Sequence, residues 1–149
     1  RSGTLDRQPT DPAALIAELR EEEGAERIRV DRREAPATWS LDRARLRQVL
    51  SNLLRNALDA SPPEAPVDVR VRAGGPSKRP ELRITVRDRG PGLPAGHEQE
   101  IFEPFFTTRT RGTGLGLAVA RRIVEQHGGS LTARNHPAGG AEFDVRIPA

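Results

Sequence analysis

The chain has 149 residues, of which 35% are hydrophobic and 30% are charged, and its formal net charge at pH 7 is +3. It has no cysteine, which excludes disulfides, thiolate metal sites and thiol catalysis, and no apolar run approaches the ~18 residues that a membrane span needs. We expect one soluble, intracellular domain with its own core, and no binding to nucleic acid, because arginines do not alternate with aromatic residues.

The first predicted elements are short. Residues 1–12 are polar and contain Gly and Pro, so we expect a linker or a cut end there, with the folded domain over 13–149. Asp11 and Pro12 are suited to cap and open a short helix with an apolar stripe of Leu15, Ile16 and Leu19. Residues 28–30 have the character of a short strand.

The strongest helical pattern runs from Asp42 to Ala60 and stops at Ser61-Pro62-Pro63. Two of the chain's three asparagines, Asn52 and Asn56, stand four residues apart on one face of this helix, next to its apolar stripe. Asparagine disfavours helix interiors, and its amide oxygen suits Mg²⁺, so the pair is a candidate metal site. The alternative is that both side chains only bind neighbouring backbone.

Two segments with alternating apolar residues, 67–71 and 82–86, are expected to be neighbouring strands joined by a loop at 74–77. The run Asp88-Arg-Gly-Pro-Gly92 follows the second strand. A carboxylate there can accept a hydrogen bond from an exocyclic amine such as adenine N6, and the glycines let a flat ring approach the backbone. The alternative is an ordinary Asp/Gly turn.

The stretch 88–112 has no sustained period and is expected to be a long functional loop. Within it, residues 101–106 hold three of the four phenylalanines, which would anchor the loop or belong to a satellite of the core. Gly112-Thr-Gly-Leu-Gly-Leu117 stands at the start of a helix expected over 115–126. Bare backbone at a helix start suits a phosphate group, although a plain turn would have the same residues.

A hairpin with strands at 131–133 and 143–147, turning at 137–140, is the last predicted element. Together the predicted helices and strands indicate an α+β sandwich with helices on one face of a mixed sheet.

The order Asn-x-x-x-Asn, Asp-x-Gly-x-Gly, Phe-x-Pro-Phe, Gly-x-Gly-x-Gly is far more specific than any of its parts. Here the chain resembles the catalytic, ATP-binding domain of sensor histidine kinases, a branch of the GHKL ATPase superfamily, in the style of nitrogen-regulation-type kinases. The resemblance covers about residues 40–149, with the N box at 46–60, the G1 box at 88–92, the F box at 102–106 and the G2 box at 112–117. It implies the Bergerat fold, a two-layer α/β sandwich with a long ATP lid.

The resemblance also implies site residues. Asn56 would be the Mg²⁺ ligand and Asn52 would lie beside it at the phosphates, the two forming the catalytic pair. Asp88 would bind adenine N6, while Gly90 and Gly92 shape the base pocket. A mobile lid over 93–111 would bring Arg109 or Arg111 to the γ-phosphate, and the remaining implied nucleotide contacts are Phe102, Thr107, Gly112, Thr113, Gly114, Leu115, Gly116 and Leu117.

Some positions depart from the family pattern. Asp59 and Ala60 stand where many members have a basic and an aromatic residue, so the resemblance implies neither a phosphate contact nor an adenine stack there. None of His97, His127 and His136 has the setting of a phosphoacceptor histidine. His127 is expected at a helix end, where the helix dipole favours it.

We therefore expect a fragment whose acceptor histidine, dimerisation helices and sensor lie upstream. It would be cytoplasmic, either in a cytoplasmic kinase or as the cytoplasmic part of a membrane-bound sensor. It would reach a membrane only through those upstream regions. Its expected partners are the dimerisation and histidine phosphotransfer domain of the same kinase, which forms the homodimer, and a response regulator receiver domain. Its expected cofactors are ATP and Mg²⁺.

Two other functions remain open. GHKL ATPases of the gyrase, Hsp90 or mismatch-repair type activate water with a Glu one turn before the Mg²⁺ ligand, where this chain has Asn52, which cannot act as a base. A degenerate nucleotide-binding adaptor would have at least one broken motif, and none is broken here.

Overall fold

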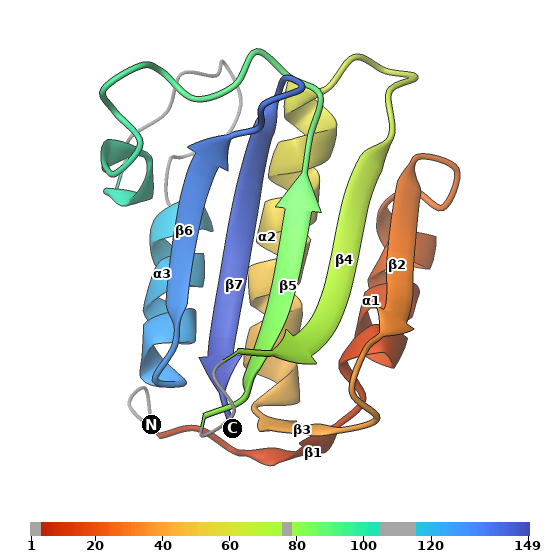
Figure 1. Cartoon of the computed structure of the whole chain (residues 1–149), viewed down its shortest axis with the longest axis vertical. Coiled ribbons are helices and arrows are strands. Elements are labelled where there is room, and N and C mark those ends of the chain that lie inside the picture. Colours follow the sequence, from red (N-terminus) through yellow and green to blue (C-terminus); the bar gives the residue numbers. More distant parts are fainter. Residues whose placement is uncertain (1–3, 76–78, 105–115) are drawn as a thin grey trace.

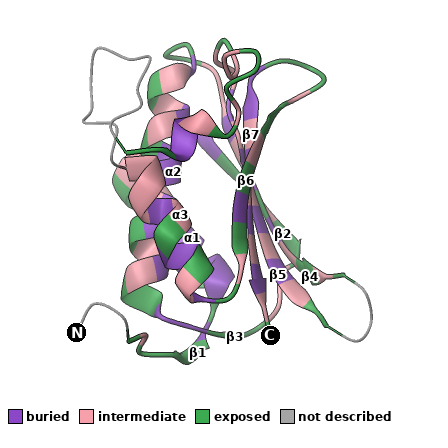
Figure 2. Cartoon of the chain, turned by 90° about the vertical axis from the view of Figure 1, so that its left-hand side faces the viewer, coloured by how far each residue is buried: buried purple, intermediate pink, exposed green. Residues whose placement is uncertain are grey.

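The computed structural model describes residues 4–75, 79–104 and 116–149 and arranges them in two layers (Figure 1). One layer is a five-stranded sheet, and the other consists of the helices α1 (Pro12–Glu23), α2 (Arg43–Ala60) and α3 (Gly116–Gln126). All three helices cover the same face of the sheet (Figure 2). The predicted α+β sandwich is therefore confirmed.

The sheet is mixed and has the strand order β2-β4-β5-β7-β6, in which β2 pairs in parallel with β4 and the other neighbours are antiparallel. Each predicted strand lies within an observed strand that is longer than the prediction. The observed bounds are β2 (Ile28–Glu34), β4 (Val67–Gly74), β5 (Glu81–Arg87), β6 (Ser130–Asn135) and β7 (Ala141–Pro148).

The core lies between the two layers. Strands β4, β5 and β7 bury alternate residues, because successive side chains of a strand point to opposite faces. Helix α2 lies behind the central strands (Figure 1) and buries a stripe at helical spacing, which is Leu46, Val49, Leu50, Leu53, Leu54 and Ala57. This packing fixes the long helix, and therefore both of its asparagines, relative to the end of β5.

Both ends of α2 are capped. At the N-terminus, Asp42 accepts a hydrogen bond from the backbone N–H of Arg45 through Oδ1 and one from that of Asp6 through Oδ2. Burial acts to raise the pKa of Asp42, but these hydrogen bonds and the charge of Arg45 outweigh it and hold the pKa below its ordinary value. At the C-terminus, the Ser61 hydroxyl donates to Ala57 O at 2.8 Å.

Two short strands are absent from the sequence-based prediction. Strand β1 (Gln8–Thr10) pairs antiparallel with β3 (Trp39–Leu41) below the main sheet (Figure 1). The predicted linker over residues 1–12 is thus replaced from Gln8 onward by a strand. Three-residue strands leave no readable alternation, which is why the composition alone favoured a linker.

None of the helices in the described ranges is long and apolar enough to cross a membrane.

Candidate functional site

Asp88 follows the last residue of β5 and is only 3% exposed. Its Oδ1 accepts hydrogen bonds from the backbone N–H groups of Gly90 and Ala141, both at 2.9 Å. Its own backbone N–H donates to Ala141 O at 2.9 Å. Oδ2 accepts no hydrogen bond from the described residues. The carboxylate is therefore held in one orientation with an acceptor oxygen to spare, which suits recognition of an amine.

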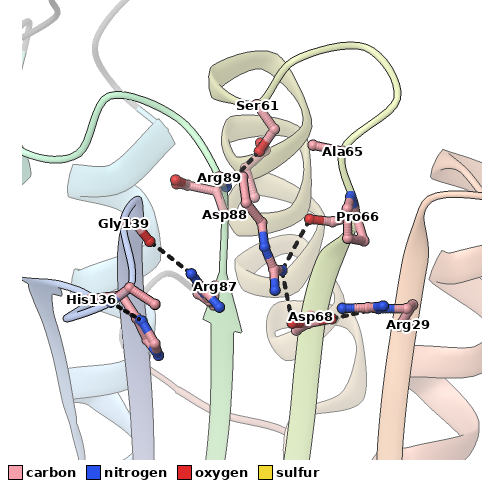
Figure 3. Close-up of polar contacts among 12 residues, drawn as sticks. Arg29, Ser61, Ala65, Pro66, Asp68, Arg87, Asp88, Arg89, His136 and Gly139 are labelled. Carbon is pink, nitrogen blue, oxygen red and sulfur yellow. Dashed lines mark hydrogen bonds and ion pairs between the residues drawn. The ribbon is translucent and has the colours of Figure 1, made fainter.

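Gly90 lies where the turn after β5 meets the end of α2. A Cβ atom on Gly90 would be 2.6 Å from Ala60 O, so no larger residue fits without movement of the backbone. Ser61 Oγ accepts a hydrogen bond from the Arg89 N–H at 2.9 Å (Figure 3). Because Ser61 also donates to the last turn of α2, one hydroxyl joins the N box helix to the G1 turn.

The side chain of Arg89 points away from Asp88, across the neighbouring strand (Figure 3). Its guanidinium donates to Pro66 O at 3.1 Å and pairs with Asp68 at 2.7 Å, and Asp68 also binds Arg29 at 2.8 Å. Burial acts to raise the pKa of Asp68, but the two arginines outweigh it and lower the pKa. Arg89 therefore fixes the turn to β4.

A residue that sequence reasoning missed holds the other end of this turn. Asn135, at the end of β6, accepts a hydrogen bond from the Leu93 N–H at 2.6 Å and donates to Leu93 O at 3.4 Å. Gly92 has a positive φ of 87°, and a Cβ atom there would be 2.6 Å from Asn135 Oδ1. The only signal in the sequence was that Asn135 is the third asparagine of an asparagine-poor chain.

The β6–β7 hairpin closes on Asp88 from the other side. Gly140 has a φ of 80°, and a Cβ atom at this position would be 2.0 Å from Asp88 O. Only a glycine allows both this backbone conformation and this approach. The hairpin and the G1 turn thus form one unit around the Asp88 carboxylate.

On the helix side, Asn52 Nδ2 donates to Gly116 O at 3.0 Å, and both Asn52 and Asn56 are half-buried. This contact brings the N box to the first residue of α3. Among the described residues no group of three or more His, Cys, Asp or Glu could hold a metal ion. A metal here would take most of its ligands from phosphate and water, as Mg²⁺ does, and the amide oxygen of Asn56 fits as its protein ligand.

Phe102 belongs to the core. It lies in a short 3₁₀ helix, η1 (Glu100–Phe102), is 4% exposed and packs edge-on against Phe143 with ring centroids 6.2 Å apart. The Arg121 guanidinium of α3 lies 5.1 Å from the Phe102 ring centroid. Of the two roles considered for these phenylalanines, Phe102 combines both, because it is buried and also anchors the segment after the G1 turn to α3 and β7.

Several predicted site residues lie outside the described residues: Thr107, Arg109, Arg111, Gly112, Thr113, Gly114 and Leu115, with the lid part 105–111. Of the remaining predicted residues of the G2 box, Gly116 opens α3 and Leu117 packs partly buried against the core.

His127 does not fit the predicted dipole role. Its ring is buried, Nε2 accepts a hydrogen bond from the Asp42 N–H at 3.0 Å, and Nδ1 lies 2.9 Å from Ile123 O, to which it donates. This pattern requires a neutral ring, so no imidazolium charge meets the helix dipole. His97 Nδ1 lies 2.8 Å from Glu100, and His136 Nδ1 accepts from the Ala138 N–H.

A family model described as histidine kinase-, DNA gyrase B- and HSP90-like ATPase matches residues 41–149. Sensor histidine kinase ZraS of Klebsiella oxytoca is 45% identical over 107 residues, which cover 72% of this chain but only 22% of that protein. Nitrogen regulation protein NtrY of Azorhizobium caulinodans is 39% identical over 101 residues, which cover 66% of this chain and 13% of NtrY. The nitrogen-regulation style is thus only loosely supported.

Solved structures are similar over nearly the whole chain. The mycobacterial sensor histidine kinase MprB superposes with a TM-score of 0.82 at 29% identity, covering 95% of this chain and 97% of that one. Full-length ShkA, in complex with AMPPNP, superposes with a TM-score of 0.79 at 30% identity, covering 97% of this chain and 31% of that one.

Proposed function

The chain belongs to the histidine kinase-, DNA gyrase B- and HSP90-like ATPase family, as an ATP-binding domain of the sensor histidine kinase type, and we propose that it presents MgATP to a histidine on a dimerisation domain. The acceptor would attack the γ-phosphorus of the bound ATP, and ADP would leave. This role requires the domain to bind, orient and neutralise the phosphates, with no base of its own.

The orientation of Asp88 is the observation that carries the proposal. Two backbone N–H groups hold Oδ1 and direct the carboxylate, which leaves Oδ2 as the oxygen that would accept the exocyclic amine of adenine. Guanine has a carbonyl oxygen at the corresponding position, and two acceptors would face each other. The site therefore favours ATP over GTP.

The helix side supports phosphate binding. Asn56 would hold Mg²⁺, which supplies charge neutralisation of the phosphate oxygens when bound. Asn52 orients the start of α3 through Gly116, and the backbone there is where the phosphates would approach. Its amide cannot take a proton from water, so hydrolysis of ATP by this chain alone should be slow. This disfavours an autonomous GHKL ATPase.

The partners follow from the same assignment. The three histidines lie in a buried helix end, in the segment after the G1 turn and in the last hairpin, so the acceptor histidine would belong to a dimerisation and phosphotransfer domain, through which the kinase forms a homodimer. A response regulator receiver domain would then take the phosphoryl group. We place all of these steps in the cytoplasm.

Phosphotransfer in trans tests the proposal. The chain is mixed with γ-labelled ATP, Mg²⁺ and the isolated dimerisation domain of a related sensor histidine kinase, and label on that domain's histidine is measured. We expect label only when all components are present, and none when the acceptor histidine is replaced by Ala. ATP hydrolysis without transfer would favour the ATPase alternative, and nucleotide binding without either reaction would favour the adaptor.

A further inference from the structure

No described helix covers the face of the five-stranded sheet that points away from α1, α2 and α3 (Figure 2). We call it the open face. A shallow groove of about 500 Å³ crosses it, and its lining is mainly arginine and carboxylate side chains. An outward sheet face needs only polar side chains to stay in water. A row of like charges on it is therefore not explained by solvation alone.

The groove has one row of charges that the strands satisfy among themselves. In register across the sheet, this row alternates in sign, as Arg29, Asp68, Arg87, Glu142 and Arg134. Arg29 pairs with Asp68, and Arg134 pairs with Glu142, both at 2.8 Å. Opposite charges on neighbouring strands stabilise a sheet, so both ends of this row are paired within the sheet, and its central Arg87 donates to Gly139 O at 3.0 Å.

A second row across the sheet has like charges in register. Arg72, Arg83 and Arg146 face one another in register on β4, β5 and β7, about 4.8 Å apart from strand to strand. Like charges in such positions disfavour the sheet. Asp144 Oδ2 serves both Arg83, at 3.1 Å, and Arg146, at 2.8 Å, and within the described ranges Arg72 forms no hydrogen bond or ion pair.

The surroundings of Arg72 disfavour its positive charge. Burial lowers the pKa of its guanidinium, and the charges of Arg83 and Arg70 lower it further, while Asp144 and Glu34 oppose them by less. Two further donors of the face, Arg83 Nε and Arg87 Nε, are buried without an acceptor in the described structure. Asp144 Oδ1 is also without a partner, because Oδ2 takes both arginines. Of the second row, Arg72 and Arg83 Nε therefore have no acceptor among the described residues.

We propose that the open face, centred on Arg72, Arg83 and Arg146, is a docking surface for an acidic segment of a partner protein. Carboxylates of that segment would supply the missing acceptors and relieve the repulsion between the arginines. The neighbouring Asp31, Asp68 and Glu142 would repel a nucleic-acid backbone but can meet basic residues of a protein. A second copy of the chain would offer the same cationic row, and its charge does not complement this one.

The surface is separate from the nucleotide site. Arg83 lies near the start of β5 and Asp88 beyond its end, and helix α2, which holds Asn52 and Asn56, covers the opposite face (Figure 2). An acidic partner could therefore bind whether or not ATP is present, and the proposal does not depend on the proposed function.

Fluorescence anisotropy with a labelled octaglutamate peptide tests this surface at physiological salt and without nucleotide. The test variant is Arg70→Gln/Arg72→Gln, and the matched control is Arg43→Gln/Arg47→Gln, which removes the same charge from α2, where these arginines pair with Glu18 and Glu22. We expect the test variant to bind the peptide about tenfold more weakly and the control to change little. Thermal unfolding checks that both variants fold.

Three results would overturn the proposal: no binding by the natural chain, equal weakening by both variants, or tighter binding of single-stranded DNA through the same arginines. Amide chemical shifts of the natural chain provide a second test that needs no variant. Addition of the peptide should shift resonances of β4, β5 and β7, and shifts confined to the helices would contradict an open-face site.

Discussion

At the proposed adenine corner, which consists of Ser61, Asp88, Gly90, Gly140 and Ala141, the backbone N–H groups of Gly90 and Ala141 fix one carboxylate before any ligand arrives. On the proposed phosphate side, Asn52 of α2 donates a side-chain hydrogen bond to Gly116 O at the start of α3. In the proposed site, base recognition would therefore be preorganised, whereas phosphate recognition would also depend on the metal and on the phosphates. A substitution on one side should therefore leave the other side unchanged.

The largest effect is expected at Gly140. Gly140→Ala would force a Cβ atom to within 2.0 Å of Asp88 O at a φ of 80°, and strain plus overpacking should lower the free energy of unfolding by about 3 kcal/mol. Gly139→Ala is the matched control, because its φ is also positive, at 102°, but nothing lies within 4 Å. Urea unfolding of both variants separates the clash from the backbone strain, and equal losses would mean that the close approach is unimportant.

Asp88→Asn should break base recognition without breaking the fold. Replacing the carboxylate by an amide removes a buried, charge-assisted hydrogen bond to adenine, which should weaken ATP binding by about 2 kcal/mol. Calorimetric titration with ATP and with GTP measures this. The ratio of the two affinities should fall toward one, and an unchanged ATP affinity would remove Asp88 from the site.

Asn56→Ala should act on the phosphate side alone. If Asn56 holds Mg²⁺, its removal should weaken MgATP binding by about tenfold, or ~1.4 kcal/mol, and leave metal-free ADP binding nearly unchanged. Titrations in the presence of Mg²⁺ and of a chelator separate these cases. An equal loss in both would show that Asn56 is structural, as the alternative holds.

Gly116→Ala tests where the phosphates approach. A Cβ atom at this position would lie 3.7 Å from Asn52 Cγ, an ordinary contact, so the free chain should keep its stability. If phosphates lie against this backbone, ATP affinity should still fall by about 1 kcal/mol, while adenosine affinity stays the same. Parallel losses for ATP and adenosine would contradict this placement.

The smallest effect is expected at Asn135, which holds Leu93 from the far side of the adenine corner. Asn135→Ala removes two hydrogen bonds that lie at the surface and should lower the free energy of unfolding by about 1 kcal/mol or less. Hydrogen exchange of the Leu93 amide should accelerate, while that of the Ala141 amide should not. Acceleration at both amides would mean that Asn135 supports the whole corner.

The long helix and the longer strands were predictable from the sequence. Helix α2 buries enough of its stripe that a 3.6-residue period is visible, and the alternation in β4 and β5 is equally clear. Asp88, Gly90 and Gly92 could be singled out because their Asp-x-Gly-x-Gly motif stands in order with three other motifs. The predicted roles of Asn52 and Asn56 at the metal and phosphates stay predictions.

The missed features depend on contacts between distant parts of the chain. Asn135 binds a residue 42 positions away, and His127 meets Asp42 across 85 positions, so neither contact leaves a local pattern. Strands β1 and β3 contain three residues each and are too short for a periodic signal. The dipole role expected for His127 failed for the same reason, because its partner was not visible in sequence.

The position of β7 has a consequence for how the domain is made. This strand follows every other element along the chain, yet it lies between β5 and β6 and donates the Ala141 N–H that fixes Asp88. During synthesis the sheet therefore stays open, with one edge of β5 unpaired, until residues 141–148 leave the ribosome. A nascent chain interrupted before this point lacks both a closed core and an oriented Asp88, so it should be a substrate for chaperones and proteases rather than a partly active kinase domain.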